Sequence, residues 1–268
     1  MAYNSLRDFI AHLEKTGRLV RVREPVSTHL EMTEIGSRLI NEKGPAVLFE
    51  NVTGHNMPVL INLFGTIERV AWGMGREPHE LRDIGEKLAF LRQPEPPGGW
   101  KEALELLPLL KTAMAMKPKT VKSAPCQEIV LTGDDIDLAK FPIQTCWPED
   151  ASPLITWPLI VTKGPGIRDQ GSEKKDSSDP RPPTPDPRDN YNLGIYRLQV
   201  TGKNTTLMRW LKHRGGAQHY ARWGKEKREP LPAAAVIGCD PATILAAVTP
   251  VPDTMSEYQY AGLLRGEK

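Results

Sequence analysis

Residues 192–210 read NLGIYRLQVTGKNTTLMRW. The stretch holds two short runs of β-branched and apolar residues, 195–200 and 206–210, with a glycine-containing turn between them. Such runs predict two short strands. Similar runs follow or precede it at 159–162, 234–237 and 244–248, with few long helical patterns between them. The second half of the chain is therefore predicted to be a small β-barrel or sandwich.

The first half has a different pattern. Leu6, Phe9, Ile10 and Leu13 recur at helical spacing, after residues that can cap a helix (Asn4 or Ser5) and before Gly17, which can end one. The same reasoning predicts helices at 30–40, 80–91 and 100–116, and strands at 19–22, 46–49 and 59–63. We expect a mixed α+β protein, with an α/β domain at 1–122 and a β domain at 123–268.

A proline-rich segment interrupts the second domain. It spans residues 168–190, is charged, and contains Pro180, Pro182, Pro183, Pro185 and Pro187. It has too little apolar surface to offset the entropy of ordering. The segment is predicted to be a flexible surface loop.

Composition excludes several classes of protein. The 268 residues carry 35 Lys and Arg against 33 Asp and Glu, so no strong overall field favours nucleic acid. No apolar run approaches the roughly 20 residues needed to span a bilayer. The first residues lack the pattern of a secretory signal, which predicts a cytoplasmic protein. Cys126, Cys146 and Cys239 are widely spaced, which predicts buried reduced thiols and neither disulfides nor zinc.

Three segments could carry chemistry. Residues 192–197 combine a glycine with Arg197, and residues 209–216 (RWLKHRGG) combine several cations, His213 and a glycine pair. Such a density of cations suits an anion, although a nucleic-acid surface or a solvated face would have the same composition. Residues 241–258 run from an apolar segment through a proline turn to Glu257, which could supply an oxygen ligand to Mg²⁺ or Mn²⁺.

These segments resemble the UbiD family of decarboxylases, most closely its bacterial ubiquinone-pathway branch. The resemblance lies in CWPEDA at 146–151, LITW at 154–157, residues 192–197, 208–216 and 240–258, and extends to GPAVLFEN at 44–51 and FLRQPEPP at 90–97. It covers nearly all of the chain except the proline-rich loop. The family fold would make residues 123–268 a split, flavin-reductase-like β-barrel.

The resemblance implies a prenylated flavin mononucleotide whose phosphate is bridged to Mn²⁺ or Mg²⁺, with K⁺ as a further candidate ion. Asn192 and Glu257 match the family's metal ligands, and His213 lies where many members supply a third. Arg197 matches a catalytic arginine that orients the substrate carboxylate. The positions that match flavin-lining residues are Thr156, Ile195, Tyr196, Arg197, Arg209, Trp210, Leu211, Arg214 and Gly215.

The implied reaction converts 3-polyprenyl-4-hydroxybenzoate to 2-polyprenylphenol and CO₂. Removing CO₂ from an aromatic acid needs an electron sink, which the modified flavin supplies in this family. A flavin prenyltransferase would supply the cofactor. We expect a homo-oligomer or a complementing C-terminal half, and placement in the cytoplasm or at the inner face of the cell membrane.

The sequence departs from the family in its long loop before Asn192 and in ending at Lys268, whereas family members continue. The family's catalytic acids lie beyond that position, so the chain alone is expected to be inactive. The alternatives are a non-catalytic flavin- or metal-binding module and a decarboxylase of another aromatic acid.

Overall fold

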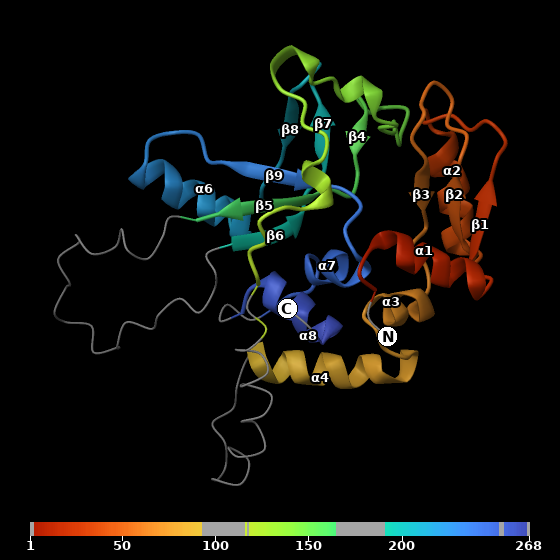
Figure 1. Ribbon diagram of the computed structural model, residues 1–268, viewed down its shortest axis with the longest axis horizontal. Helices are drawn as coiled ribbons and strands as arrows, with labels where there is room; N and C mark the ends of the chain where they lie inside the picture. Colours follow the sequence, from red (N-terminus) through yellow and green to blue (C-terminus); the bar gives the residue numbers. More distant parts are fainter. Residues whose placement is uncertain (1–2, 93–115, 117, 165–190, 252–254, 267–268) are drawn as a thin grey trace, which may run out of the picture.

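A computed structural model describes residues 3–92, 116, 118–164, 191–251 and 255–266 of the chain (Figure 1). Within these ranges the strands form three small sheets, β1-β2-β3, β4-β7-β8 and β6-β5-β9. The predicted mixed fold is confirmed. The strands of the second half pair as two separate three-stranded sheets, so the split barrel stays a prediction. The proline-rich loop at 168–190 and most of the helix expected at 100–116 lie outside the described residues.

The first sheet and its helices follow the sequence pattern closely. β1 and β2 are parallel and β2 and β3 are antiparallel. Ser5 caps the first helix by accepting a hydrogen bond from the Asp8 N–H at 3.2 Å, and Gly17 follows the helix with a φ of +70°. The elements are α1 (Leu6–Lys15), β1 (Leu19–Val22), α2 (Glu31–Asn41), β2 (Ala46–Phe49), β3 (Val59–Ile61), α3 (Ile67–Gly73) and α4 (Leu81–Arg92).

The strands of the second half form two antiparallel sheets. The strand expected at 195–200 is split, because β6 ends at Ile195 and β7 begins at Leu198 in a different sheet. The elements are β4 (Leu154–Ile155), β5 (Leu159–Lys163), β6 (Tyr191–Ile195), β7 (Leu198–Val200), β8 (Thr206–Met208), α6 (Gly215–Glu226), β9 (Ala233–Val236), α7 (Pro241–Ala246) and α8 (Glu257–Arg265).

The strand predicted at 244–248 is wrong. Residues 241–246 form helix α7, whose N-cap Asp240 accepts a hydrogen bond from the Thr243 N–H at 3.1 Å. Pro241 occupies the first turn, where its missing N–H costs nothing. The apolar run alone does not distinguish a buried helix from a buried strand, and the Asp-Pro start signal decides for the helix.

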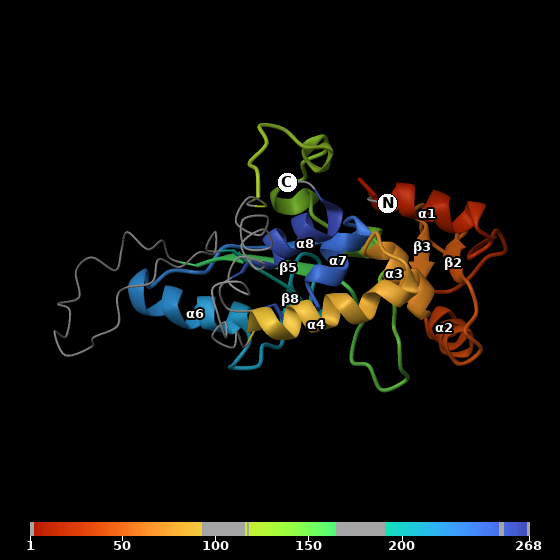
Figure 2. The same cartoon turned by 90° about the horizontal axis from the view of Figure 1, so that it is seen from below.

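Packing joins the two halves of the chain. Leu63 and Phe64, from the segment after β3, pack against a buried cluster that contains Leu159, Leu193 and Ile244. The Phe64 and Trp157 rings stack with their centroids 5.8 Å apart. Helices α7 and α8 bury a second cluster against Met74 and α4, and Figure 2 shows α4 running alongside them. None of the described helices is long and apolar enough to cross a membrane.

The three cysteines have different environments. Cys146 is buried and Cys239 is half-buried, but Cys126 is exposed, so the prediction that all three thiols are buried is wrong for Cys126. Burial, followed by the nearby Asp240 carboxylate, raises the pKa of the Cys239 thiol to about 11. This thiol therefore stays protonated and unreactive at neutral pH.

We expect a thiol reagent to label one cysteine of the native protein quickly and the other two only after unfolding. The reason is that the thiolate must be both formed and accessible to react. Stopped-flow absorbance with a disulfide reagent at pH 8 would measure the fast fraction, and Cys126→Ser should abolish it. Fast labelling that survives in Cys126→Ser would contradict the assignment.

Candidate functional site

The candidate site begins on the paired strands β5 and β6. Asn192 of β6 lies opposite Thr162 of β5 in the antiparallel register, and both side chains are buried, with 9% and 0% exposed. The Thr162 hydroxyl is 2.9 Å from Nδ1 of His219, which is also buried. This contact holds helix α6 against the sheet. Sequence reasoning did not identify Thr162 or His219, because 57 residues separate them and neither belongs to a motif.

The glycine pair at the start of α6 allows a close approach. A Cβ added to Gly215 would lie 1.8 Å from Oδ1 of Asn192. A Cβ added to Gly216 would lie 2.8 to 3.0 Å from atoms of the Trp210 indole ring. Both positions therefore require glycine for space. The pair brings the first turn of α6 onto Asn192 and Trp210.

Gly215→Ala is expected to destabilise the protein by about 1–3 kcal/mol, because the added methyl group would displace the buried Asn192 side chain. Gly224→Ala in the same helix is the matched control, since nothing lies within 4 Å of its Cβ position. The control should be neutral or stabilising by up to about 1 kcal/mol. Urea unfolding of both variants measures the difference, and equal midpoints would refute the steric argument.

The start of helix α8 places Glu257 beside Asn192, which the sequence pattern did not predict. Glu257, which follows the proline turn, opens helix α8. Ser256 and Gln259 form a capping box that fixes this helix start. Oε2 of Glu257 accepts a hydrogen bond from the Leu193 N–H at 3.2 Å, one residue along from Asn192.

Tyr196 completes the arrangement. Its ring covers Gly194, where a Cβ would lie 2.7 Å from the ring, and its hydroxyl lies close to the Asn192 side chain. Burial raises the pKa of Tyr196, while the nearby Asn192 side chain and the charge of Arg214 lower it. The Tyr196 and Trp210 rings meet edge to face at 6.0 Å. We call Asn192, Tyr196, Trp210, Arg214, Gly215 and Glu257 the Asn192 cluster.

Other residues predicted for the site lie around this cluster. Arg197, Arg209, Leu211 and His213 are exposed, whereas Thr156 and Ile195 are half-buried. The carbonyl of His213 accepts a hydrogen bond from Gln218, and among the described residues the His213 ring makes no hydrogen bond to Asn192 or Glu257. In the same part of the chain, no three His, Cys, Asp or Glu side chains converge as a metal cage. A ligand role for His213 stays a prediction.

The cluster has chemistry suited to an acceptor-rich ligand and a hard cation. Nδ2 of Asn192 and Nε1 of Trp210 are buried with no hydrogen-bond partner among the described residues. Buried donors are normally paired, so these two N–H groups are available to a bound acceptor. The side-chain oxygens of Asn192 and Glu257 are of the type that Mg²⁺ and Mn²⁺ prefer. The residues therefore fit a phosphate-bearing cofactor with a divalent ion.

Comparison with known families agrees with this fold. Residues 10–88 match the 3-octaprenyl-4-hydroxybenzoate carboxy-lyase N-terminal domain, and residues 119–176 and 180–268 match the Rift-related domain of the same enzymes. The chain belongs to the UbiD family of carboxy-lyases. The members of this family are decarboxylases.

Solved structures of decarboxylases are similar over almost the whole chain. Vanillic acid decarboxylase from Sedimentibacter hydroxybenzoicus, in its closed form, is 25% identical with a TM-score of 0.74, covering 99% of this chain and 49% of that one. The UbiD-class enzyme HmfF from Pelotomaculum thermopropionicum, in complex with FMN, is 28% identical with a TM-score of 0.65, covering 98% and 49%. An evolved dimeric form of HmfF, in complex with prenylated FMN, is 26% identical with a TM-score of 0.67, covering 99% and 51%. The chain spans about half the length of these proteins.

Proposed function

We propose that this chain is the N-terminal and central part of a decarboxylase that uses prenylated FMN and a divalent metal ion. The observation that supports this proposal is the Asn192 cluster, in which two unpartnered buried donors lie beside carboxylate and amide oxygens. The complexes of HmfF with FMN and with prenylated FMN support the same cofactor class. The proposed substrate is 3-polyprenyl-4-hydroxybenzoate, with 2-polyprenylphenol as the product for ubiquinone biosynthesis.

Each residue of the cluster has a proposed part. Asn192 and Glu257 would hold the metal ion through their oxygens, and Arg214 would add positive charge beside the cofactor phosphate. Tyr196 stays protonated at neutral pH, because burial raises its pKa, so its hydroxyl remains a donor. Exposed Arg197 would orient the substrate carboxylate. When bound, the prenylated flavin supplies the electron sink that decarboxylation of an aromatic acid needs.

The active site also needs a proton donor. That donor would come from the half of the family's length that this chain does not cover, on the same chain or on another one. A flavin prenyltransferase would supply the cofactor. A small aromatic acid is a second candidate substrate, because the vanillic acid decarboxylase is similar over 99% of this chain. Decarboxylation assays of the completed protein with both acids would decide between them. Flavin retention without turnover of any acid would instead favour a non-catalytic cofactor-binding module.

Metal binding provides the direct test. Asn192→Ala and Glu257→Ala should each lose most of the bound Mn²⁺, because a hard cation loses an oxygen ligand in either variant. Glu149→Ala, which removes an exposed carboxylate that is not part of the cluster, is the control and should keep its metal. Elemental analysis measures the metal and visible absorbance measures the flavin. Undiminished metal in both cluster variants would refute the assignment.

A further inference from the structure

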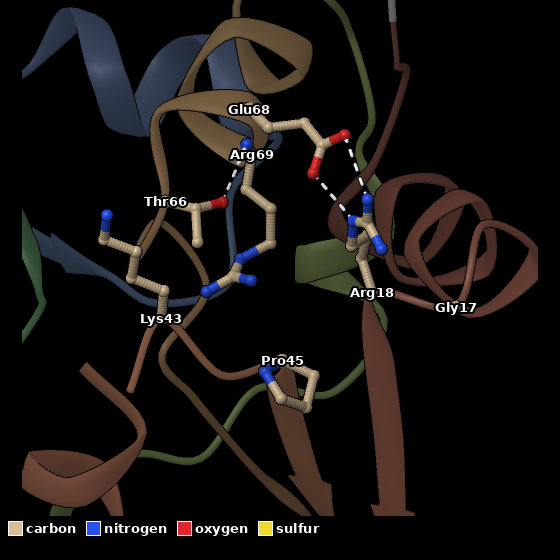
Figure 3. A pocket seen from close by; sticks show the side chains of 7 residues that line it. All are labelled: Gly17, Arg18, Lys43, Pro45, Thr66, Glu68 and Arg69. Atoms are coloured by element: carbon tan, nitrogen blue, oxygen red, sulfur yellow. Dashed lines mark hydrogen bonds and ion pairs between the residues drawn. The ribbon is translucent and has the colours of Figure 1, made fainter. Parts of the chain in front are cut away.

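A polar cavity lies in the N-terminal half of the chain. It has a volume of about 300 Å³, which is at the lower end of the range of ligand pockets. Figure 3 shows its lining, which comes from the turn before β1, the turn before β2 and the start of α3. None of the lining residues belongs to the Asn192 cluster.

The charges that line this cavity do not balance. Nε and Nη2 of Arg18 bind the two carboxylate oxygens of Glu68 at 2.7 and 3.3 Å, so this pair is internally compensated. Arg69 and Lys43 complete the charged lining. No ion pair involves either side chain in the described part of the chain, and Figure 3 shows the Arg69 guanidinium between Lys43 and Arg18. The cavity therefore carries an excess of positive charge.

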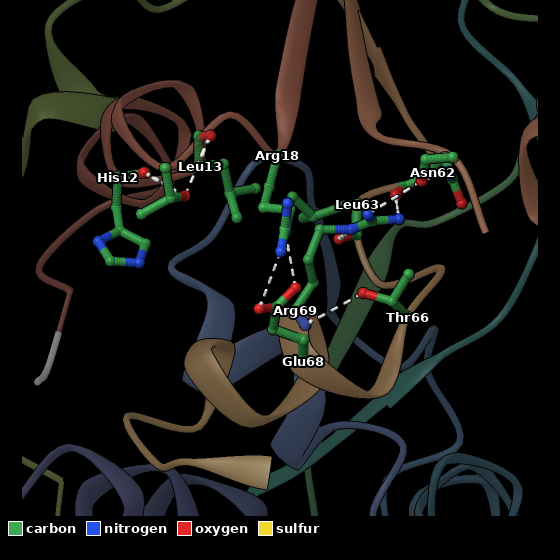
Figure 4. Close-up of polar contacts among 10 residues, drawn as sticks. His12, Leu13, Arg18, Asn62, Leu63, Thr66, Glu68 and Arg69 are labelled. Atoms are coloured by element: carbon green, nitrogen blue, oxygen red, sulfur yellow. Dashed lines mark hydrogen bonds and ion pairs between the residues drawn. The ribbon is translucent and has the colours of Figure 1, made fainter.

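Arg69 is an unusual part of this lining because its side chain is only 1% exposed. Its nitrogens donate to three backbone carbonyls, those of Leu63 at 3.1 Å, Gly44 at 3.0 Å and Asn62 at 3.0 Å (Figure 4). Carbonyls satisfy N–H groups without neutralising the charge, and both terminal nitrogens carry a second N–H. Burial lowers the pKa of this guanidinium. A buried cation of this kind gains from an anion brought next to it.

Lys43 is held at the rim by an unfavourable backbone conformation. Its φ is +54°, at the position after α2 where glycine is usual. The Gly44 N–H donates to the Leu39 carbonyl at 2.7 Å and fixes this turn. Lysine at such a position is costly for the turn, and its side chain forms part of the cavity lining.

We propose that this cavity binds the phosphate group of a small molecule. A phosphate dianion matches the two uncompensated cations, and the Thr66 hydroxyl at the wall can donate a further hydrogen bond. The cavity volume has room for a small phosphate-bearing molecule. Because Arg69 also binds the carbonyls of Asn62 and Leu63, and Leu63 packs against the sheet that carries Asn192, phosphate bound here would stabilise the contact between the two halves.

Thermal unfolding of the 268-residue chain with added inorganic phosphate tests this proposal. Potassium chloride at equal ionic strength removes the general screening effect. We expect a saturable rise in Tm with phosphate, since a ligand that binds only the folded state stabilises it by mass action. Lys43→Gln keeps the backbone conformation available and removes the charge, and it should weaken the apparent affinity about tenfold, the effect of a contact worth about 1.4 kcal/mol.

Lys140→Gln, which removes an exposed lysine outside the cavity, is the matched control and should bind like the wild type. ³¹P line broadening measured on the same three proteins provides a reading that does not depend on unfolding. Tighter binding of glucose 6-phosphate than of inorganic phosphate would identify a phosphate monoester as the ligand, and the reverse order would identify free phosphate. The proposal is overturned if phosphate has no effect beyond that of chloride, or if Lys43→Gln binds as tightly as the wild type.

Discussion

Arg69→Met is expected to destabilise the protein by about 3–5 kcal/mol, more than any exposed substitution. The variant removes hydrogen bonds from the partly buried carbonyls of Gly44, Asn62 and Leu63, which the buried Arg69 side chain now satisfies. Each buried acceptor left unsatisfied costs about 1–3 kcal/mol, and the methionine side chain recovers part of this through packing. The midpoint of urea unfolding, with the slope held constant, measures the loss.

Arg38→Met is the control for this experiment. Arg38 pairs with Glu34 at 2.7 Å on helix α2, but its side chain is 74% exposed. An exposed pair at this spacing contributes about 0.3–0.5 kcal/mol. If Arg69→Met were no more destabilising than Arg38→Met, the three carbonyl contacts would not anchor the segment after β3.

Arg197→Ala is expected to reduce kcat/KM for decarboxylation about 100-fold in the completed, cofactor-loaded protein. A charge-assisted hydrogen bond to the substrate carboxylate is worth up to about 3 kcal/mol, and each 1.36 kcal/mol corresponds to a factor of ten. Arg197→Lys should recover little activity, because an ammonium group cannot replace a two-pronged contact. Release of CO₂ under single-turnover conditions measures the chemical step.

Folding should not change in these variants, because the Arg197 side chain is exposed and outside the buried clusters. Arg7→Ala, at an exposed site on α1, controls for a general loss of positive charge. Activity of Arg197→Ala within a factor of two of the wild type would remove Arg197 from the proposed mechanism.

Local signals in the sequence predicted local structure well. The capping residue Ser5, the apolar spacing up to Leu13 and the glycine at position 17 define α1 closely. The run at 244–248 was wrongly predicted to be a strand, because a buried helix and a buried strand are equally apolar. Asp240 and Pro241, which precede the run, are the signal for the start of a helix. The break between β6 and β7 could not be predicted from residues 195–200, because it depends on which sheet each strand joins.

The candidate site was predictable to a smaller extent. The family resemblance made Asn192 and Glu257 candidate metal ligands, but their proximity depends on how the start of α8 meets β6. The contact between Thr162 and His219 and the close approach of Gly215 to Asn192 join segments far apart in the chain. No local pattern encodes such contacts, because they arise only when the strands and helices pack.

The packing of α4 against α7 and α8 has a consequence for synthesis on the ribosome. Ile84 and Leu88 contact a cluster built from residues 242–264, so their apolar face has no native partner when α4 first emerges. At about 5–20 residues per second, roughly 10 to 35 s pass before α8 is made. During that interval the nascent chain carries an exposed apolar helix, which is the type of surface that chaperones bind.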